Sequence, residues 1–271
     1  VESIFNLAAS GSYDDAYGDF SIFVNGGSAF RDKIIVTIDT GASSIDHRHD
    51  TNLSAGIADG HWHHYAVTVK SSGSSDTVTQ LFIDGTLQSS LTSNTAISEV
   101  TGSKGMVAAL GALAATKNKT SAFGHPDEGW GNIIQTSFDE FRYWKVARDE
   151  QDIGRNWNTH INGGTNTDDS NTDLGVYFKF NEGVTGINSV DQTILDYSGR
   201  YGNGTFINYT SGSSRKIESA FELYTSGSLT ETKDPILYSY HPDVVNVINE
   251  YTNLGDVYDK QNNSSLLNTL P

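Results

Sequence analysis

Two groups of histidines are the residues of this chain best suited by type to metal or acid–base chemistry. His47 and His49 lie in the run DHRHD, where a strand would put both rings on one face and the aspartates on the other. The second group follows the Asp59-Gly60 turn and comprises His61, His63 and His64. A zinc site needs three or four converging ligands, and neither group has a spacing such as HExxH. The two groups could build a site only across adjacent strands, so we favour the alternative that these rings are hydrogen-bonded in or beside a sheet.

The sequence FGHPDEGWGN at 123–132 is a candidate binding loop. Trp130 stands between glycines, where it could be exposed and stack on a sugar ring. Asp127, Glu128 and Asn132 could bind sugar hydroxyls or a calcium ion through their oxygen atoms. The competing interpretation is that Trp130 folds back and anchors the loop.

Asp139 lies within a largely apolar strand sequence, SFDEFRYWKVA. A carboxylate there is costly unless it is paired or binds a metal ion. Ligation of Ca²⁺ by its oxygens would resolve this conflict, and two backbone N–H groups would resolve it equally well.

The motifs of the common enzyme classes are missing from the sequence. There is no G-x-S-x-G elbow, no cysteine nucleophile, no phosphate-binding glycine loop and no E-x-D-x-E pattern of paired carboxylates. We therefore expect a protein that is not an enzyme. A polysaccharide-degrading enzyme is the least favoured alternative.

The charge balance restricts the partners of the chain. Seventeen basic residues against 33 acidic ones give a net charge of −16, which would repel nucleic acid and anionic membranes. The most apolar run, MVAALGALAA, is far shorter than the roughly 20 residues that span a bilayer, so we expect no membrane insertion. The chain starts at Val1 and stops at Pro271, and we expect it to be a piece of a longer polypeptide.

Short runs of β-branched and aromatic residues, separated by Gly-, Ser- and Asp-rich turns, indicate an antiparallel β-sandwich. Asp84-Gly85 predicts a two-residue hairpin, because both positions of a type I′ turn have positive φ. We expect a strand that begins at His63, with Trp62 packed on the sandwich. Aromatics on both faces of 137–147 predict a central strand that is covered on both sides.

The single helix expected in the first two-thirds of the chain spans 147–158, with Asp149 and Glu150 at its start and a stripe of Ile153 and Trp157. We divide the chain into a sandwich, a linker or long loop, a β segment, and an extended or helical C-terminal arm, at 1–160, 161–173, 174–222 and 223–271. Within 234–255 of the arm, a helix is expected with Pro242 in its first turn and its end before Gly255.

Three segments together resemble laminin-G-like domains of the concanavalin A-like lectin/glucanase superfamily: DGHWHHYAVTV, TQLFIDGTLQSS and SFDEFRYWKVARDEQDI. The later segments VYFKFNEG and LDYSGRYGNGTF resemble the opening strands of that family. The resemblance covers about residues 1 to 222. It implies a jelly-roll sandwich and, from calcium-binding members, a structural ligand at Asp139. Because the opening motif follows the closing one, either a second module starts near 174 or these strands complete the first sandwich, whose own first strands are missing.

A further resemblance links the chain to large structural proteins of contractile-tailed marine bacteriophages. It rests on SFDEFRYWK, LGVYFKFNEG and KDPILYSYHPDVV, in that order. It implies a virion tail or baseplate component whose partners are other virion subunits, further copies of the chain and cell-surface glycans. The alternative is a stand-alone calcium-dependent carbohydrate-binding lectin, secreted or at a cell surface.

Overall fold

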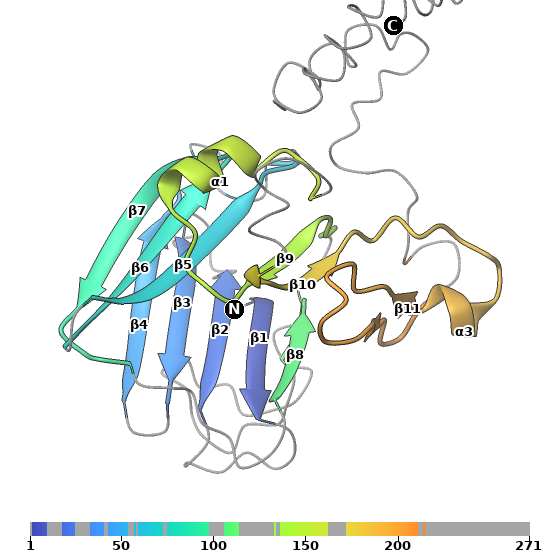
Figure 1. The fold of residues 1–271 in the computed structure, drawn as a ribbon, viewed down its shortest axis with the longest axis horizontal. Coiled ribbons are helices and arrows are strands. Elements are labelled where there is room, and N and C mark those ends of the chain that lie inside the picture. The colour runs from blue at the N-terminus through green and yellow to red at the C-terminus, as the bar shows by residue number, and fades with distance from the viewer. Residues whose placement is uncertain are drawn as a thin grey trace, which may run out of the picture. The chain divides into compact units, whose positions relative to one another are not determined.

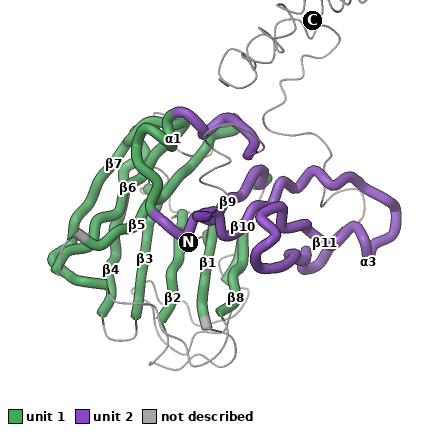
Figure 2. Tube along the Cα trace, viewed as in Figure 1, with its two compact units in different colours: residues 1–137, 147–154 green, residues 138–146, 155–271 purple. Residues whose placement is uncertain are grey.

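The computed structural model divides the chain into two compact units that interleave in sequence (Figure 2). Unit 1 comprises residues 1–137 and 147–154, and unit 2 comprises residues 138–146 and 155–271. The structure describes residues 2–9, 18–24, 33–40, 43–53, 57, 59–72, 75–97, 106–113, 133, 136–161, 172–210 and 214. The predicted arm at 223–271, with its helix between Pro242 and Gly255, therefore lies outside the described residues.

A five-stranded antiparallel sheet forms one layer of unit 1 (Figure 1). Its strands, in sheet order, are β4 (Ser44–Asp50), β3 (Lys33–Asp39), β2 (Asp19–Val24), β1 (Glu2–Ala9) and β8 (Met106–Leu110). The alternation expected of a strand is complete in β4, where buried and exposed side chains follow each other residue by residue. His47 and His49 are both on the buried face, as the sequence predicts.

A three-stranded antiparallel sheet forms the other layer of unit 1, in the order β5 (Tyr65–Ser72), β6 (Asp76–Ile83) and β7 (Thr86–Ser93). The turn between β6 and β7 has φ of 49° at Asp84 and 77° at Gly85. Positive φ at both central residues is the type I′ geometry whose twist matches that of the flanking strands. The predicted hairpin is therefore confirmed.

The two sheets share one apolar core within unit 1. Buried aliphatic side chains of both layers pack together, namely Val24, Ile34, Val36, Leu81 and Ile83. Burying such a side chain stabilises the fold by about 1.5–3 kcal/mol. The unit is thus mainly β, with antiparallel sheets packed as a sandwich, in agreement with the sequence.

Helix α1 (Glu150–Asn156) begins directly after Asp149. The backbone N–H of Asp152 donates to Asp149 Oδ1 over 2.8 Å, which satisfies one of the free donors of the first turn. Ile153 is buried, and Gly154 faces the Gly85 carbonyl so closely that an added Cβ would lie 3.4 Å from it. The predicted helix at 147–158 exists, but it is shorter at both ends.

The described residues of unit 2 form two small antiparallel sheets and one short helix, besides the end of α1. β9 (Phe141–Trp144) pairs with β10 (Leu174–Phe178), and β11 (Thr193–Ile194) pairs with β12 (Gly204–Thr205). Helix α3 (Asn188–Asp191) precedes β11. The strand before α1 therefore pairs with the strand that follows the predicted loop at 161–173.

The prediction of a central strand over 137–147 is wrong. β9 has four half-buried residues, and in the part of the chain that the structure describes its neighbour is β10 alone. The strand is also shorter than predicted, because Glu140, directly before β9, adopts φ of 53°, a left-handed conformation that interrupts an extended run.

Among the described residues, no helix is long and apolar enough to span a bilayer.

Candidate functional site

The predicted binding loop cannot be located in the structure. Asp127, Glu128, Trp130 and Asn132 all lie outside the described residues. Ile133, directly after the loop, donates its N–H over 2.9 Å to the carbonyl of Gly111, which lies before the loop and just past the end of β8. The assignment of these four residues to a glycan site stays a prediction.

Asp139, the predicted calcium ligand, lies half-buried two residues before β9. Its neighbour Glu140 is the carboxylate that the fold buries, with a side chain only 6% exposed. In the described ranges, no three His, Asp or Glu side chains are grouped so that they could hold a metal ion. Calcium binding at Asp139 stays a prediction.

The histidines of β4 form a buried chain of hydrogen bonds with hydroxyl groups. Thr79 Oγ1 lies 2.6 Å from His47 Nδ1 and 2.8 Å from His49 Nε2, and Ser89 Oγ lies 3.0 Å from His49 Nδ1. A hydroxyl donates one proton and accepts others, so one proton on each ring satisfies the whole chain in either direction. The expectation of histidines hydrogen-bonded within a sheet is confirmed for this pair.

Burial decides the charge of these two rings. It lowers the pKa of His49 to about 4, with the neighbouring His47 acting in the same direction and Asp50 against it. Burial also lowers the pKa of His47, against the attraction of Asp46. Both rings are neutral at physiological pH, and they link β4 to β6 across the sandwich.

His63 has different partners, because both of its ring nitrogens face carboxylates. Nδ1 lies 2.7 Å from Asp84 Oδ2, and Nε2 lies 2.9 Å from Asp59 Oδ2. Hydrogen bonds to Asp59 and then to Asp84 raise the pKa of His63 against partial burial. The predicted hydrogen bonding beside a sheet is confirmed here too, since β5 begins two residues later, at Tyr65.

Two predictions about residues 59–62, called the Trp62 turn from here on, and the strand that follows them are wrong. Trp62 does not pack on the sandwich, because it is 56% exposed, and the strand begins at Tyr65 and not at His63. The turn is fixed by its own polar groups: Gly60 has φ of 84°, and the N–H of His61 donates to Asp59 Oδ1 over 2.9 Å.

A second face of the five-stranded sheet carries a short buried polar chain. Asn6 Nδ2 donates to Ser21 Oγ over 2.8 Å, and that hydroxyl donates to Asp19 Oδ2 over 3.2 Å. All three side chains are buried. This chain of hydrogen bonds ties β1 to β2.

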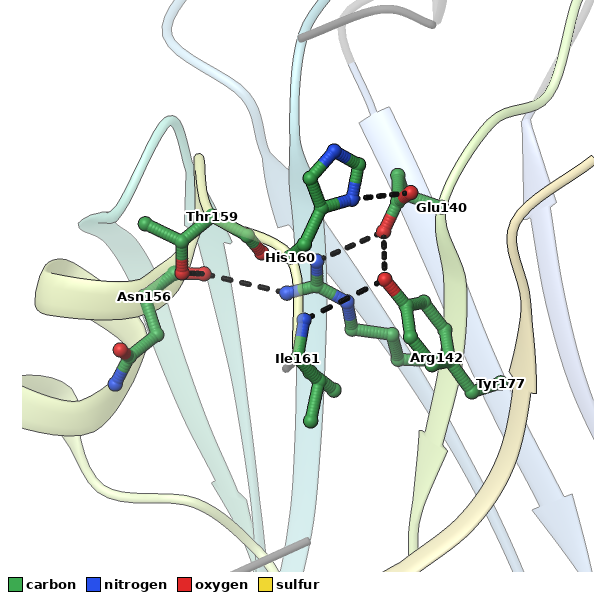
Figure 3. A network of polar contacts seen from close by, with 7 residues as sticks. All are labelled: Glu140, Arg142, Asn156, Thr159, His160, Ile161 and Tyr177. Atoms are coloured by element: carbon green, nitrogen blue, oxygen red, sulfur yellow. Dashed lines mark hydrogen bonds and ion pairs between the residues drawn. The ribbon is translucent and has the colours of Figure 1, made fainter. Parts of the chain in front are cut away.

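Unit 2 is organised around the buried carboxylate of Glu140 (Figure 3). Its Oε2 accepts from the Tyr177 hydroxyl over 2.5 Å and from Arg142 Nη2 over 2.9 Å. Its Oε1 lies 2.9 Å from His160 Nδ1, a distance that allows an ion pair. The carboxylate thereby joins β9, β10 and the segment that follows α1.

Arg142 extends the same network to the end of the helix. Its guanidinium donates to the carbonyls of Asn156 and Thr159 (Figure 3). A cation at a helix C-terminus satisfies free carbonyls and is favoured by the helix dipole. Its charged end also lies 5.3 Å from the centre of the Tyr177 ring.

The electrostatics of Glu140 indicate a structural group. Burial alone would raise its pKa, but His160, Arg142 and the Tyr177 hydroxyl together hold the pKa below its ordinary value. An ionised carboxylate with several close donors is a weak base. The sequence favours Asp139 as the functional carboxylate and does not indicate Glu140, because the left-handed turn that buries Glu140 has no local sequence signal.

No known family model matches the chain, and no curated protein matches it. A solved structure from Bacteroides ovatus, of a candidate carbohydrate-binding protein, matches with a TM-score of 0.43 at 19% sequence identity. The match covers 75% of this chain and 51% of that protein, so the chain spans about half the length of the protein it matches. At this level of similarity the match does not indicate what this chain does.

Proposed function

We propose that the chain is a non-enzymatic structural protein of a phage tail or baseplate. Its sandwich would be a laminin-G-like jelly roll that serves assembly, adhesion to glycans on the host surface, or both. The antiparallel sandwich of unit 1 supports a lectin-like framework, and the sequence resemblance to phage structural proteins supports the virion setting.

The observation that carries the adhesive function is the exposed indole of Trp62. A side chain of this size, 56% exposed on the surface, would bury its apolar face on contact with the C–H face of a sugar ring. The exposed His61 lies in the same turn and offers a polar ring for hydroxyls. An exposed aromatic face with a polar group beside it is typical of a sugar-binding surface.

The Trp62 turn is also fixed before any ligand arrives. Asp59 accepts from the His61 backbone and contacts the His63 ring, and Asp84 accepts from the His64 backbone over 2.8 Å. Because the turn has little freedom to lose, binding would cost little conformational entropy.

A glycan array with the full chain tests the adhesive function. We expect binding to at least one class of surface glycan, and a loss of at least tenfold in affinity for Trp62→Ala. Tyr201→Ala is the matched control, since Tyr201 is an aromatic residue of unit 2 that is 72% exposed. An array without binding, or an equal loss in the control, would overturn the assignment to Trp62.

The predicted loop is a separate arm of the same experiment. If Trp130→Ala, and not Trp62→Ala, abolishes binding, the glycan site is the loop with Asp127, Glu128 and Asn132. A calcium requirement would appear as a melting temperature that falls with chelator in the parent chain and not in Asp139→Asn.

Assembly is tested on the same protein. We propose that copies of the chain associate, and sedimentation equilibrium over a hundredfold range of concentration should show a mass above that of the 29.4 kDa monomer. A monomer at every concentration would contradict self-association.

A further inference from the structure

The His63 side chain lies between the Trp62 turn and the β6–β7 hairpin and contacts both. On one side Nε2 contacts Asp59 of the turn, and on the other Nδ1 contacts Asp84 of the hairpin. Next to it, the His64 N–H donates to Asp84 Oδ1 and the Asp84 N–H donates to the His64 carbonyl, so the chain after the turn is held at the hairpin whatever the state of the ring. The contact of the turn itself with the hairpin, through Asp59, depends on the His63 ring.

The geometry determines the protonation state of the ring. A carboxylate at neutral pH only accepts hydrogen bonds, so both ring nitrogens must donate. A neutral imidazole has one N–H, and its second nitrogen would direct a lone pair at a carboxylate oxygen less than 3 Å away. Only the doubly protonated imidazolium satisfies both contacts.

We infer that His63 is a proton-dependent latch, which as an imidazolium holds the Trp62 turn against the hairpin and on losing a proton releases it. The presentation of Trp62 would therefore depend on pH. This inference does not require that Trp62 binds a glycan.

The groups around His63 favour this behaviour. Asp59 and Asp84 are the charges that act on it, and the Tyr65 ring lies edge-on at 6.2 Å between ring centres. The pKa of Tyr65 is raised to about 12, by burial first and then by the two aspartates, so its hydroxyl stays neutral throughout. His61 acts on Asp59 from the same turn, and the neighbouring His64 contributes its backbone N–H to Asp84.

Helix α1 approaches the hairpin turn from another side, at Gly154. Its ionisable residues are Glu150, Asp152 and Arg155, and Asp152 pairs with Arg148 at 3.4 Å. Asp152 therefore offers a matched aspartate that belongs to a different ion pair.

Nitrogen-15 NMR of the imidazole rings of the full chain tests the protonation state. We expect both His63 nitrogens to carry protons at pH 6.5, and the His63 pKa to lie above the ordinary 6.5. Asp59→Asn and Asp84→Asn should each lower that pKa, whereas Asp152→Asn should leave it unchanged. Asn is well tolerated at position 84, because it too adopts the positive φ of a type I′ turn.

Hydrogen exchange tests the release. The backbone amide of His61, which donates to Asp59 Oδ1, should lose protection at least tenfold between pH 6 and pH 9, after correction for intrinsic rates, while amides of β7 should not. A single ring proton on His63 at pH 6.5 overturns the latch. A His63 titration with unchanged exchange of the turn overturns the release.

Discussion

The β4 histidines and His63 lie in the same unit and all contact side-chain oxygen atoms through their rings, yet they respond to protons in opposite ways. His47 and His49 face hydroxyls in a buried chain, where each ring needs one proton. His63 faces two carboxylates near the surface, where the ring needs two protons. The partner, more than the residue type, therefore decides whether a histidine stabilises this fold as a neutral or as a charged group.

The opposite signs follow from linkage between protonation and folding. The pKa of His49 is lower in the folded chain than the ordinary 6.5, so unfolding takes up a proton and acid weakens the fold. The pKa of His63 is higher in the folded chain, so its stabilisation is complete below 6.5 and is lost as pH rises through the raised value. Each prediction below would break or sharpen this contrast.

The largest effect is expected when the hydroxyl shared by both β4 histidines is removed. Thr79→Val keeps the shape of the side chain but leaves one nitrogen of each buried ring without a partner. At about 2 kcal/mol for each unsatisfied buried group, the free energy of unfolding should fall by about 4 kcal/mol. Urea denaturation measures this loss.

Thr92→Val, at an exposed position of β7, is the matched control and should change stability by less than about 0.5 kcal/mol. An equal, small effect at both positions would mean that the buried chain of hydrogen bonds contributes nothing to the fold.

The next effect is the acid response of His49. With an ordinary pKa of 6.5 and a folded value of about 4, moving from pH 7 to pH 4 should cost roughly 3 kcal/mol of stability. In His49→Gln this part of the pH dependence should vanish, although that variant is less stable at pH 7. Parallel stability curves for the parent and the variant between pH 7 and pH 4 would contradict a neutral His49.

Unit 2 extends the contrast from histidines to a carboxylate, since Glu140 is charged and buried at once. Tyr177→Phe removes the hydroxyl that donates to Glu140 over 2.5 Å and leaves the ring in place. A hydrogen bond to a charged group contributes about 1.5–3 kcal/mol, so we expect a loss of about 2 kcal/mol.

Tyr201→Phe removes a hydroxyl from an exposed ring and should be neutral in the same denaturation experiment. If the two variants are equally stable, Arg142 and His160 alone are sufficient partners for the Glu140 carboxylate.

The sequence predicts well those features that depend on a few neighbouring residues, such as the buried face of a strand and the type of a turn. The alternation in β4 places His47 and His49 on the inner face, and Asp84-Gly85 determines its own turn. Both are properties of a few neighbouring residues. The antiparallel sandwich follows from repeating such stretches with turns between them.

What the sequence does not predict depends on partners that are distant in the chain. Glu140 is buried because it meets His160 and Tyr177, which lie 20 and 37 positions later. Trp62 is exposed, and its neighbour His63 contacts Asp84, which lies 22 positions after Trp62. Neither the burial of Glu140 nor the exposure of Trp62 leaves a periodic pattern in the sequence.

The smallest effect, and the most specific test of the contrast, is expected at His63. His63→Gln keeps one donor but loses the charge, so at pH 6 it should cost about 1 kcal/mol, typical of a partly exposed ion pair. At pH 9 the parent ring has also lost its charge and donates once, so the two chains should be equally stable. The difference between them must therefore shrink as pH rises, whereas the difference caused by His49→Gln must shrink as pH falls. A His63→Gln cost that stays constant from pH 6 to pH 9 would show that the ring contributes by packing, and the two histidine environments would then not differ in charge.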